Sequence, residues 1–206
     1  MENSQKLTKG EQTRRRLMDA AEELFAAQGY DNTSLRDVAG AAGIREPGIY
    51  NHFASKEALY ERVLERALQP LLEVIGETLA RGVSEQDLIA LPGKITDLLC
   101  LHPAMPALFH QALSSRPRGA GQDLMNDWLA RLFEQGGALW AAFGATEEDR
   151  ARMTVRMVML FNVVTGYFLT QKIFDQAGVG HLMDANNLAE QNRLLAKFMT
   201  LFSLER

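Results

Sequence analysis

The sequence has very little cysteine and no uninterrupted hydrophobic run long enough to cross a membrane. Its 206 residues include one cysteine, Cys100, which excludes an intrachain disulfide and leads us to expect a reducing, cytoplasmic environment. The longest apolar segment, residues 153–170, contains Arg156 and Asn162, and this favours a buried helix over a membrane span. The first ten residues, MENSQKLTKG, are polar and lack the apolar core of a signal peptide.

The sequence also lacks the motifs of common enzymes and metal sites. It has no phosphate-binding loop and no dinucleotide fingerprint. Cys100 lies two residues from His102, and side chains two apart on a helix do not face each other. His102 and His110 are widely spaced, without a nearby cluster of carboxylates or thiols. We therefore expect no enzymatic activity, no metal site and no cofactor.

A strong excess of charge of one sign is missing as well, because the net charge is −4. The distribution is more informative than the total. Residues 1–16 hold five basic and two acidic side chains, whereas residues 67–206 hold 12 basic and 15 acidic ones. The chain is therefore expected to place a basic N-terminal contact face on an acidic body.

What the sequence does contain is helical periodicity. No segment alternates polar and apolar residues with a period of two, which would indicate strands. Apolar residues recur every three or four positions instead, as in the stripe of Leu17, Ala20, Ala21, Leu24 and Phe25. The pattern predicts an all-α chain of about nine helices. They are expected at about residues 13–28, from Ser34 to Gly43, from Pro47, and at 55–82, 94–101, 103–114, 121–143, 147–175 and 187–203.

Helix ends are marked by hydroxyl residues placed three positions before a carboxylate. This spacing is typical of a capping box, in which each side chain bonds a free backbone N–H of the other residue. It occurs at Ser34 with Asp37, at Ser84 with Asp87 and at Thr146 with Asp149. Pro70 lies inside the expected helix 55–82 and predicts a kink or a break there, and Pro92-Gly93 predicts another interruption.

The N-terminal helices have the arrangement of a helix-turn-helix. Two short helices are joined by a tight turn at residues 43–46, and the helix at 13–28 supplies an apolar platform for them. In such a unit the second helix of the pair enters the DNA major groove. We expect Ile49 and Phe53 to fix this second helix to its platform.

Residues 29–59, GYDNTSLRDVAGAAGIREPGIYNHFASKEAL, resemble the DNA-binding segment of the TetR family of transcriptional regulators. The positions that fit the family pattern are Gly29, Thr33, Ser34, Val38, Ala39, Ala42, Gly43, Ile49, Tyr50, His52, Phe53, Lys56, Glu57 and Leu59. The resemblance covers about the first quarter of the chain. It implies a helix-turn-helix DNA-binding domain at residues 1–54 and a helical effector-binding and dimerisation domain at residues 55–206, with the helix at about 55–82 as the connection.

The resemblance also implies which side chains contact DNA. Phosphate contacts are expected from Thr33, Ser34, Tyr50, His52 and Lys56. Base contacts are expected from Arg36, Arg45, Glu46 and Asn51, although Arg36, Arg45 and Asn51 could equally be solvated or bind phosphate alone. The chain departs from the family at Arg45-Glu46-Pro47-Gly48. The usual hydroxyl cap is missing there, and Gly48 has no side chain with which to make a contact.

The C-terminal half carries a helix at 147–175 that is apolar almost all round, so it needs a covering on every side. The resemblance implies a homodimer built on the last two helices, and a palindromic DNA operator follows from that symmetry. The alternative is a monomer with a thick core.

The family's ligand pocket lies inside this body, so a small hydrophobic effector is expected, either a flat compound or one of fatty-acyl type. Candidate pocket residues are Met105, Phe109, His110, Trp128, Phe133, Met157, Phe161 and Asn162, with His110 or Asn162 as the polar group. For any single apolar candidate, an ordinary core position is the stronger interpretation.

Two functions are compatible with these patterns. The first is a TetR-type ligand-responsive regulator, a repressor that binds its operator as a homodimer and is released by the effector. The second is a helical dimeric co-regulator or scaffold with a weak or vestigial DNA-binding unit, which the unusual residues 45–48 favour.

Overall fold

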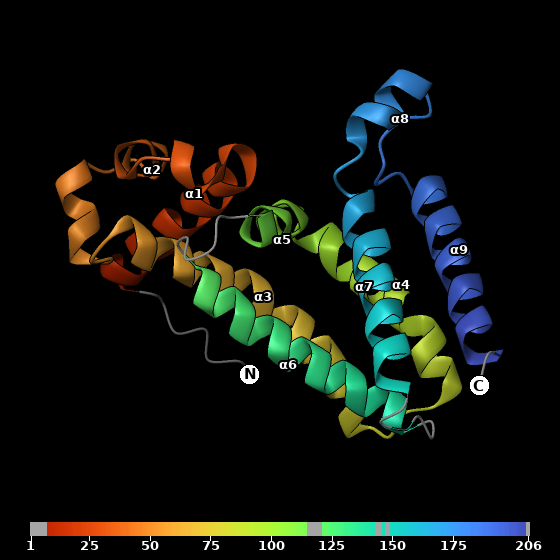
Figure 1. Cartoon of the computed structure of the whole chain (residues 1–206). Helices are drawn as coiled ribbons and strands as arrows, with labels where there is room; N and C mark the ends of the chain where they lie inside the picture. Colours follow the sequence, from red (N-terminus) through yellow and green to blue (C-terminus); the bar gives the residue numbers. More distant parts are fainter. Residues whose placement is uncertain (1–7, 115–120, 143–145, 147–148, 205–206) are drawn as a thin grey trace, which may run out of the picture. The chain divides into compact units, whose positions relative to one another are not determined.

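The computed structural model describes residues 8–114, 121–142, 146 and 149–204. These residues form nine α-helices and one 3-10 helix, and no strand occurs among them (Figure 1). The elements are α1 Lys9–Asn32, α2 Leu35–Ala41, η1 Glu46–Asn51, α3 Lys56–Ala80, α4 Glu85–Leu101, α5 Met105–Ser114, α6 Gln122–Ala141, α7 Arg150–Tyr167, α8 Gln171–Ala177 and α9 Ala185–Leu204. The predicted all-α class is confirmed.

The chain divides into two compact units. The N-terminal unit comprises residues 1–67 and 107–125, and the second unit comprises residues 68–106 and 126–206. The division falls within α3, α5 and α6, so these helices contribute residues to both units. The functional domains expected at 1–54 and 55–206 remain a prediction.

The core of the N-terminal unit is formed by α1, α2, η1 and the first half of α3. Leu17, Phe25, Val38, Ile49 and Leu59 are completely buried. Because burying one such side chain contributes about 1.5–3 kcal/mol, this cluster supplies much of the stability of the unit.

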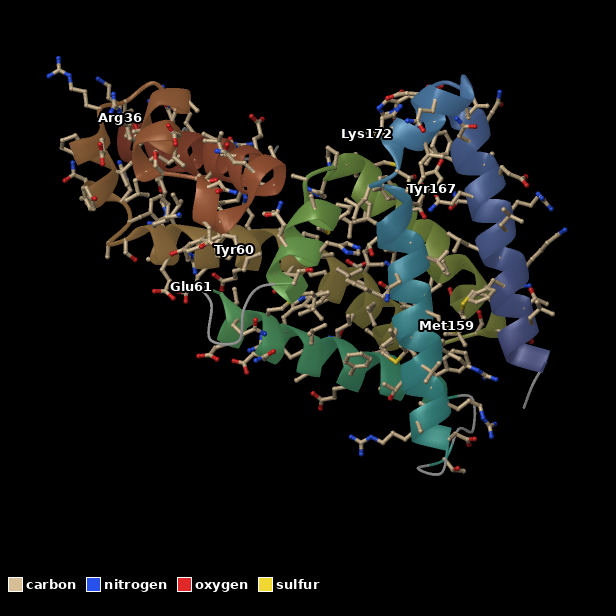
Figure 2. The ribbon with its side chains drawn as sticks, turned by 45° about the horizontal axis from the view of Figure 1, so that its top comes forward. Arg36, Tyr60, Glu61, Met159, Tyr167 and Lys172 are labelled. Carbon is tan, nitrogen blue, oxygen red and sulfur yellow. The ribbon has the colours of Figure 1, made fainter. Side chains whose placement is uncertain are left out.

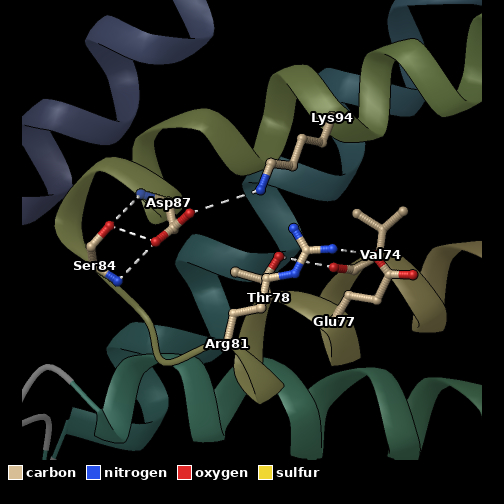
Figure 3. Close-up of polar contacts among 7 residues, drawn as sticks. All are labelled: Val74, Glu77, Thr78, Arg81, Ser84, Asp87 and Lys94. Atoms are coloured by element: carbon tan, nitrogen blue, oxygen red, sulfur yellow. Dashed lines mark hydrogen bonds and ion pairs between the residues drawn. The ribbon is translucent and has the colours of Figure 1, made fainter.

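Two of the three predicted capping boxes are present. Ser34 and Asp37 form a capping box, and so do Ser84 and Asp87, which Figure 3 shows in the second unit. Thr146 and Asp149 are hydrogen-bonded, but α7 begins only at Arg150, with Asp149 as its N-cap. Gly29 has φ of +85°, a conformation that L residues with a side chain rarely adopt, and α1 bends there before it ends at Asn32. The predicted end of the first helix at residue 28 is therefore the site of this kink.

Prolines interrupt the helices less than their sequence positions predict. Pro70 lies inside α3 and Pro92 lies inside α4, and each helix continues through its proline. The prediction of an interruption at Pro92-Gly93 is therefore wrong, and α3 does not break at Pro70, where a kink or a break was expected. Both prolines lie among well-packed turns, and Pro92 is itself buried, so packing outweighs the cost of a proline in a helix, about 3 kcal/mol.

The long helix expected at 147–175 is instead two helices. α7 ends at Tyr167, and α8 begins at Gln171 at an angle of 56° to α7. The Thr170 hydroxyl donates a hydrogen bond of 2.6 Å to the Tyr167 carbonyl, and the Thr170 N–H donates to the same carbonyl at 3.1 Å. These bonds close the chain into a tight turn, which ends α7.

In the second unit, α4 packs against both α7 and α9 (Figure 1). Leu91 and Leu99 of α4 are buried with Val164 of α7 and with Leu195 and Met199 of α9. α8 and the segment that follows it lie beyond the ends of α7 and α9. This arrangement leaves one face of α7 exposed.

Candidate nucleic-acid interface

The helix-turn-helix is built from α2, a turn and η1. α2 starts at the Ser34 cap and stops at Ala41, after which Gly43 adopts a φ of +68°. The Ile44 N–H then donates to the Ala39 carbonyl at 2.9 Å, which holds the turn against the end of α2. Glycine at position 43 is therefore required by the backbone.

The recognition element η1 is a 3-10 helix of six residues. Pro47 lies in its first turn, as the sequence predicts, and the Gly48 N–H donates to the Arg45 carbonyl at 2.9 Å. Ile49 is completely buried and Phe53 is 4% exposed, so the two predicted anchors hold η1 to the platform. A 3-10 helix is short and has poorer hydrogen-bond geometry than an α-helix, which makes these anchors important.

The side chains expected to read bases project into solvent. Arg36 lies on the exposed surface of α2 (Figure 2), and Arg45, Glu46 and Asn51 are exposed at the turn and on η1. Tyr50 is 56% exposed, which is unusual for an aromatic side chain beside a packed core. These five side chains give the helix-turn-helix a polar surface with planar donors, acceptors and one aromatic ring.

Two of the residues expected to contact phosphate are turned toward the protein. Thr33 is 2% exposed, and its hydroxyl donates to the Gly29 carbonyl at 2.8 Å. The Lys56 ammonium lies 4.2 Å from the centre of the Tyr30 ring and donates to the Asp31 carbonyl at 3.4 Å. A phosphate contact from either side chain would have to replace these interactions.

Ser34 and His52, which were also expected to contact phosphate, have different surroundings. The Ser34 hydroxyl donates to the Asp37 carboxylate at 2.5 Å and accepts the Asp37 N–H at 3.1 Å. The hydrogen bonds from the Ser34 hydroxyl and N–H lower the pKa of the Asp37 carboxyl, so this group stays ionised at the start of α2. A phosphate near Ser34 would meet that negative charge. His52 is partly exposed and is the C-cap residue of η1.

Two arginines of α1 contact the helix-turn-helix and were not among the predicted site residues. The Arg14 guanidinium donates to the His52 carbonyl at 3.3 Å and lies 4.8 Å from the centre of the Phe53 ring. The Arg16 guanidinium lies beside Gly43, within 3.9 Å of the position that a Cβ would occupy there. The basic run at 14–16 was visible in the sequence, but its contacts were not, because they join residues far apart in the chain.

Comparison with known proteins agrees with this geometry. Residues 17–63 match the model of the family described as bacterial regulatory proteins, tetR family. The N-terminal region of the chain is therefore of the TetR family. The HTH-type transcriptional repressor KstR2 of Rhodococcus jostii (strain RHA1) is 39% identical over 80 residues, which is 38% of this chain and 39% of KstR2. The HTH-type transcriptional regulator UidR of Escherichia coli (strain K12) is 35% identical over 79 residues, 36% of this chain and 39% of UidR.

These curated relatives are thus matched over about two fifths of their own length. Solved structures extend the likeness to the whole fold. A TetR-family transcriptional regulator from Bordetella parapertussis 12822 has a TM-score of 0.72 at 17% identity and covers 90% of this chain and 93% of its own. The transcriptional regulator FadR from Bacillus subtilis, solved in complex with stearoyl-CoA, has a TM-score of 0.67 at 17% identity and covers 90% and 96%. At this identity the likeness establishes the fold of the chain alone, including that of its C-terminal half.

The candidate pocket residues are distributed over both units. Phe109 and His110 belong to the N-terminal unit, and the other six belong to the second unit. Met105 and Phe109 are completely buried. Trp128 is 5% exposed, and its indole N–H donates to the Leu68 carbonyl at 3.2 Å.

The remaining candidates lie on α6 and α7. Phe133 and Met157 are partly buried, and Met157 fits against Gly136 of α6. The Phe161 ring lies 6.5 Å from that of Trp128. Asn162, expected to be a polar group of the pocket, is exposed on α7, and its amide donates to the Val158 carbonyl at 2.8 Å.

Buried amides in the second unit are polar groups that the sequence did not single out. Gln191 of α9 is 8% exposed, and both its amide nitrogen and its amide oxygen lack a hydrogen-bond partner. The amide oxygens of Gln135 and Asn192 are buried without a partner as well. Because an unpaired buried polar group costs about 1–3 kcal/mol, such groups are candidates for a water or a ligand contact. No pattern in the sequence separates them from surface amides.

Within the described ranges, no group of three or more histidine, cysteine or acidic side chains could hold a metal ion. No single described helix has both the length and the apolarity of a membrane span, although the bent pair α7 and α8 meets those two criteria when taken together.

Proposed function

We propose that the protein is a ligand-responsive transcriptional regulator, a repressor that binds a palindromic operator in double-stranded DNA as a homodimer. The observation that carries the proposal is the helix-turn-helix itself. The residues that match the family, 17–63, include the recognition element η1. Buried Ile49 and Phe53 anchor this element, and Arg45, Glu46 and Asn51 are exposed on or beside it.

In the proposed complex, η1 enters the major groove. Arg36 and Arg45 would donate to guanine O6 and N7, and Glu46 would accept from cytosine N4. The Tyr50 hydroxyl and His52 would bind phosphates that flank the groove. The backbone at Gly48 offers no side chain, so the base contacts fall to the residues on either side of it.

The homodimer is proposed to form through α7 and α9. Val155, Val158 and Val163 of α7 and Leu194 and Leu201 of α9 are all exposed. Apolar residues on successive turns of neighbouring helices are typical of a surface that a partner covers. Two recognition elements about 34–36 Å apart would then meet successive major grooves on one face of the DNA.

The effector is proposed to be a small hydrophobic molecule, of fatty-acyl type, that releases the protein from DNA. Stearoyl-CoA is bound in the structure of Bacillus subtilis FadR, which shares the fold. In this chain, the buried amide groups of Gln135 and Gln191 could form hydrogen bonds with the polar end of such a molecule. The repressor role is supported by KstR2, a relative that is named a repressor.

A fluorescence-anisotropy titration with DNA from upstream of the protein's own gene tests the proposal. We expect affinity to fall steeply with salt, because phosphate contacts release counterions, and to differ between the operator and scrambled DNA. Arg45→Ala should relax the preference at one base pair and cost about 1–3 kcal/mol, whereas Tyr50→Phe should weaken binding to all sequences alike.

Binding that is absent or blind to sequence would instead favour a dimeric co-regulator with a vestigial DNA-binding unit. The 3-10 geometry of η1 and the Pro47-Gly48 pair are the observations that favour this second function. If Arg45→Ala binds every operator variant as the wild type does, the assignment of Arg45 to base reading is wrong.

A further inference from the structure

The buried face of α6 has one position without a side chain. Trp128, Leu132, Gly136 and Leu139 follow one another at intervals of four, four and three residues, so they lie on one face of the helix. All four are buried, and at Gly136 this face offers only backbone. A side chain from a neighbouring helix therefore has room to approach the backbone of α6 there.

Met157 of α7 occupies that room. A Cβ placed on Gly136 would overlap the terminal methyl group of Met157 and would lie 2.9 Å from its sulfur. We call the space that a side chain at position 136 would fill the Gly136 notch. At the next residue, Gly137, a Cβ would meet nothing within 4 Å, so only one of these two adjacent glycines is filled by a neighbour.

The aromatic neighbours of the notch are held in place, whereas its filler can move. Trp128, on the same face of α6, donates its indole N–H to the Leu68 carbonyl at 3.2 Å. The Phe161 ring, one turn after Met157 on α7, lies 6.5 Å from the Trp128 ring. Methionine has three rotatable bonds and adapts its shape to irregular gaps. Because Met157 is only partly buried, its side chain can leave the notch without disrupting the core.

The shape of the Met157 side chain indicates which ligand the notch fits. Beyond its Cβ, this side chain is an unbranched chain of one methylene, one sulfur and one methyl group. Such a chain is apolar and about as wide as an n-alkyl chain, whereas a methyl-branched chain or an aromatic ring is wider. The neighbouring aromatic side chains are also of the kind that lines pockets for hydrophobic ligands. The notch therefore fits the end of a straight aliphatic chain.

We propose that the Gly136 notch binds the unbranched end of an alkyl chain, and that Met157, which fills the notch in this structure, leaves it when the chain enters. Gly136 and Met157 then determine the specificity for straight chains over branched chains and rings. This inference rests on the proposed hydrophobic effector and narrows its chemistry, since the sequence left a flat compound and a fatty-acyl chain as alternatives.

Isothermal titration calorimetry with palmitate and isopalmitate tests the inference. The two fatty acids have the same number of carbons, but the chain of isopalmitate is branched at its end. Gly136→Ala fills the notch, and Met157→Ala empties it. Gly137→Ala is the matched control, because it makes the same exchange at the adjacent position, where a Cβ has room. Circular dichroism checks that each variant keeps the helical content of the wild type.

We expect the wild type to bind palmitate several-fold more tightly than isopalmitate. Gly136→Ala should bind palmitate about ten-fold more weakly, which corresponds to about two methylene groups left unburied, and should lose the preference for the straight chain. Gly137→Ala should bind both fatty acids as the wild type does. Met157→Ala should bind palmitate as tightly as the wild type or more tightly, because no side chain has to leave the notch first.

The outcomes separate this inference from the proposal on which it rests. If palmitate binds the wild type, and Gly136→Ala binds it as Gly137→Ala does, the notch is not the subsite and the fatty-acyl effector stands. Weaker palmitate binding by Met157→Ala would also contradict the inference, because Met157 would then be a fixed contact of the ligand. If the wild type binds neither fatty acid, the inference and the fatty-acyl effector are both wrong.

A measurement on the wild type tests the displacement of Met157 even if Gly136→Ala does not fold. In NMR spectra of protein labelled at its methionine methyl groups, the Met157 signal is assigned by its loss in Met157→Ala. We expect a nuclear Overhauser effect between this methyl group and the α protons of Gly136, and we expect it to disappear when palmitate binds. An effect that persists in the palmitate complex would overturn the inference.

Discussion

Arg14 contacts the recognition element at its C-terminal end, where helices have carbonyls without intrahelical partners. Its guanidinium satisfies the His52 carbonyl and stacks on Phe53, the residue that anchors η1. A cation at this end also interacts favourably with the helix dipole. Arg14 lies outside the residues that match the family, 17–63, so its role follows from the contacts of this chain alone.

We predict that Arg14→Ala weakens operator binding by about ten-fold without changing the slope of affinity against salt, because the residue positions η1 and does not bind phosphate. Arg14→Lys should be nearly as weak, since an ammonium keeps the charge but not the planar stacking. Anisotropy titrations at several salt concentrations give both quantities. Full binding by Arg14→Lys, with a slope reduced by about one in Arg14→Ala, would identify Arg14 as a phosphate contact instead.

Loss of the hydroxyl should affect stability at one tyrosine of the N-terminal unit and DNA binding at another. The Tyr60 hydroxyl is buried without a partner, and burial raises its pKa to about 12. Tyr60→Phe removes this unsatisfied group, so we expect urea denaturation to give an unchanged or higher free energy of unfolding, by up to about 1 kcal/mol. Tyr50→Phe, at an exposed site, should leave stability unchanged and weaken DNA binding. A loss of stability in Tyr60→Phe would show that its hydroxyl has a partner.

At the scale of the helices, the capping boxes couple stability to pH. Hydrogen bonds from Ser84 lower the pKa of the Asp87 carboxyl, and those from Ser34 do the same for Asp37. A group whose pKa is lowered by folding stabilises the protein above its unfolded pKa, and this contribution is lost as the pH falls through the folded value. The caps should therefore contribute fully at neutral pH and progressively less below about pH 4.

Ser84→Ala tests this coupling. We expect the variant to melt at a lower temperature than the wild type at pH 7, and the difference to shrink as the pH falls below about 4, because the Asp87 carboxyl is protonated first in the unfolded state and then, at lower pH, in the folded state. Gln86→Ala, a change at an exposed residue of the same first turn, is the matched control. A difference that stays constant over this pH range would mean that the Asp87 carboxylate plays no part in the cap.

The helices also show which structural features a local sequence pattern can predict. Caps and apolar stripes depend on residues three or four apart, so Ser34, Ser84 and the core positions of α1 were predictable. The continuity of α3 and α4 through Pro70 and Pro92 depends on packing against distant residues, which no local pattern contains. The break after Tyr167 escaped prediction because the apolar spacing continues across it, from Gly166 to Ile173.

In the candidate site, too, features that depend on neighbouring residues were predictable and features that depend on tertiary contacts were not. Exposed residues of the helix-turn-helix, such as Arg45 and Tyr50, follow from a short, ordered motif. The inward turns of Thr33 and Lys56 and the contacts of Arg14 depend on tertiary structure. Asn162 was expected inside a pocket, but its side chain is exposed on α7, and this depends on how α7 packs.

For the whole molecule, DNA recognition, pairing of subunits and effector binding are proposed to occupy different parts of the chain. The residues proposed for DNA recognition lie in the N-terminal unit, and the exposed apolar side chains of α7 and α9 lie in the second unit. The family match covers the first of these, and the shared fold covers both. A regulator of this kind needs the two recognition elements of a dimer at a fixed spacing, so a change in pairing is expected to change DNA affinity.

The measurement that tests the account most directly is the binding of purified protein to its upstream DNA, titrated at several salt concentrations and with each half of the operator scrambled in turn. We predict a complex of two chains per palindrome, with affinity that falls linearly with salt on logarithmic axes and that drops sharply when either half-site is scrambled. Binding by a single chain, or affinity that ignores the scrambled half-site, would contradict the central claim that this protein reads a palindromic operator as a dimer.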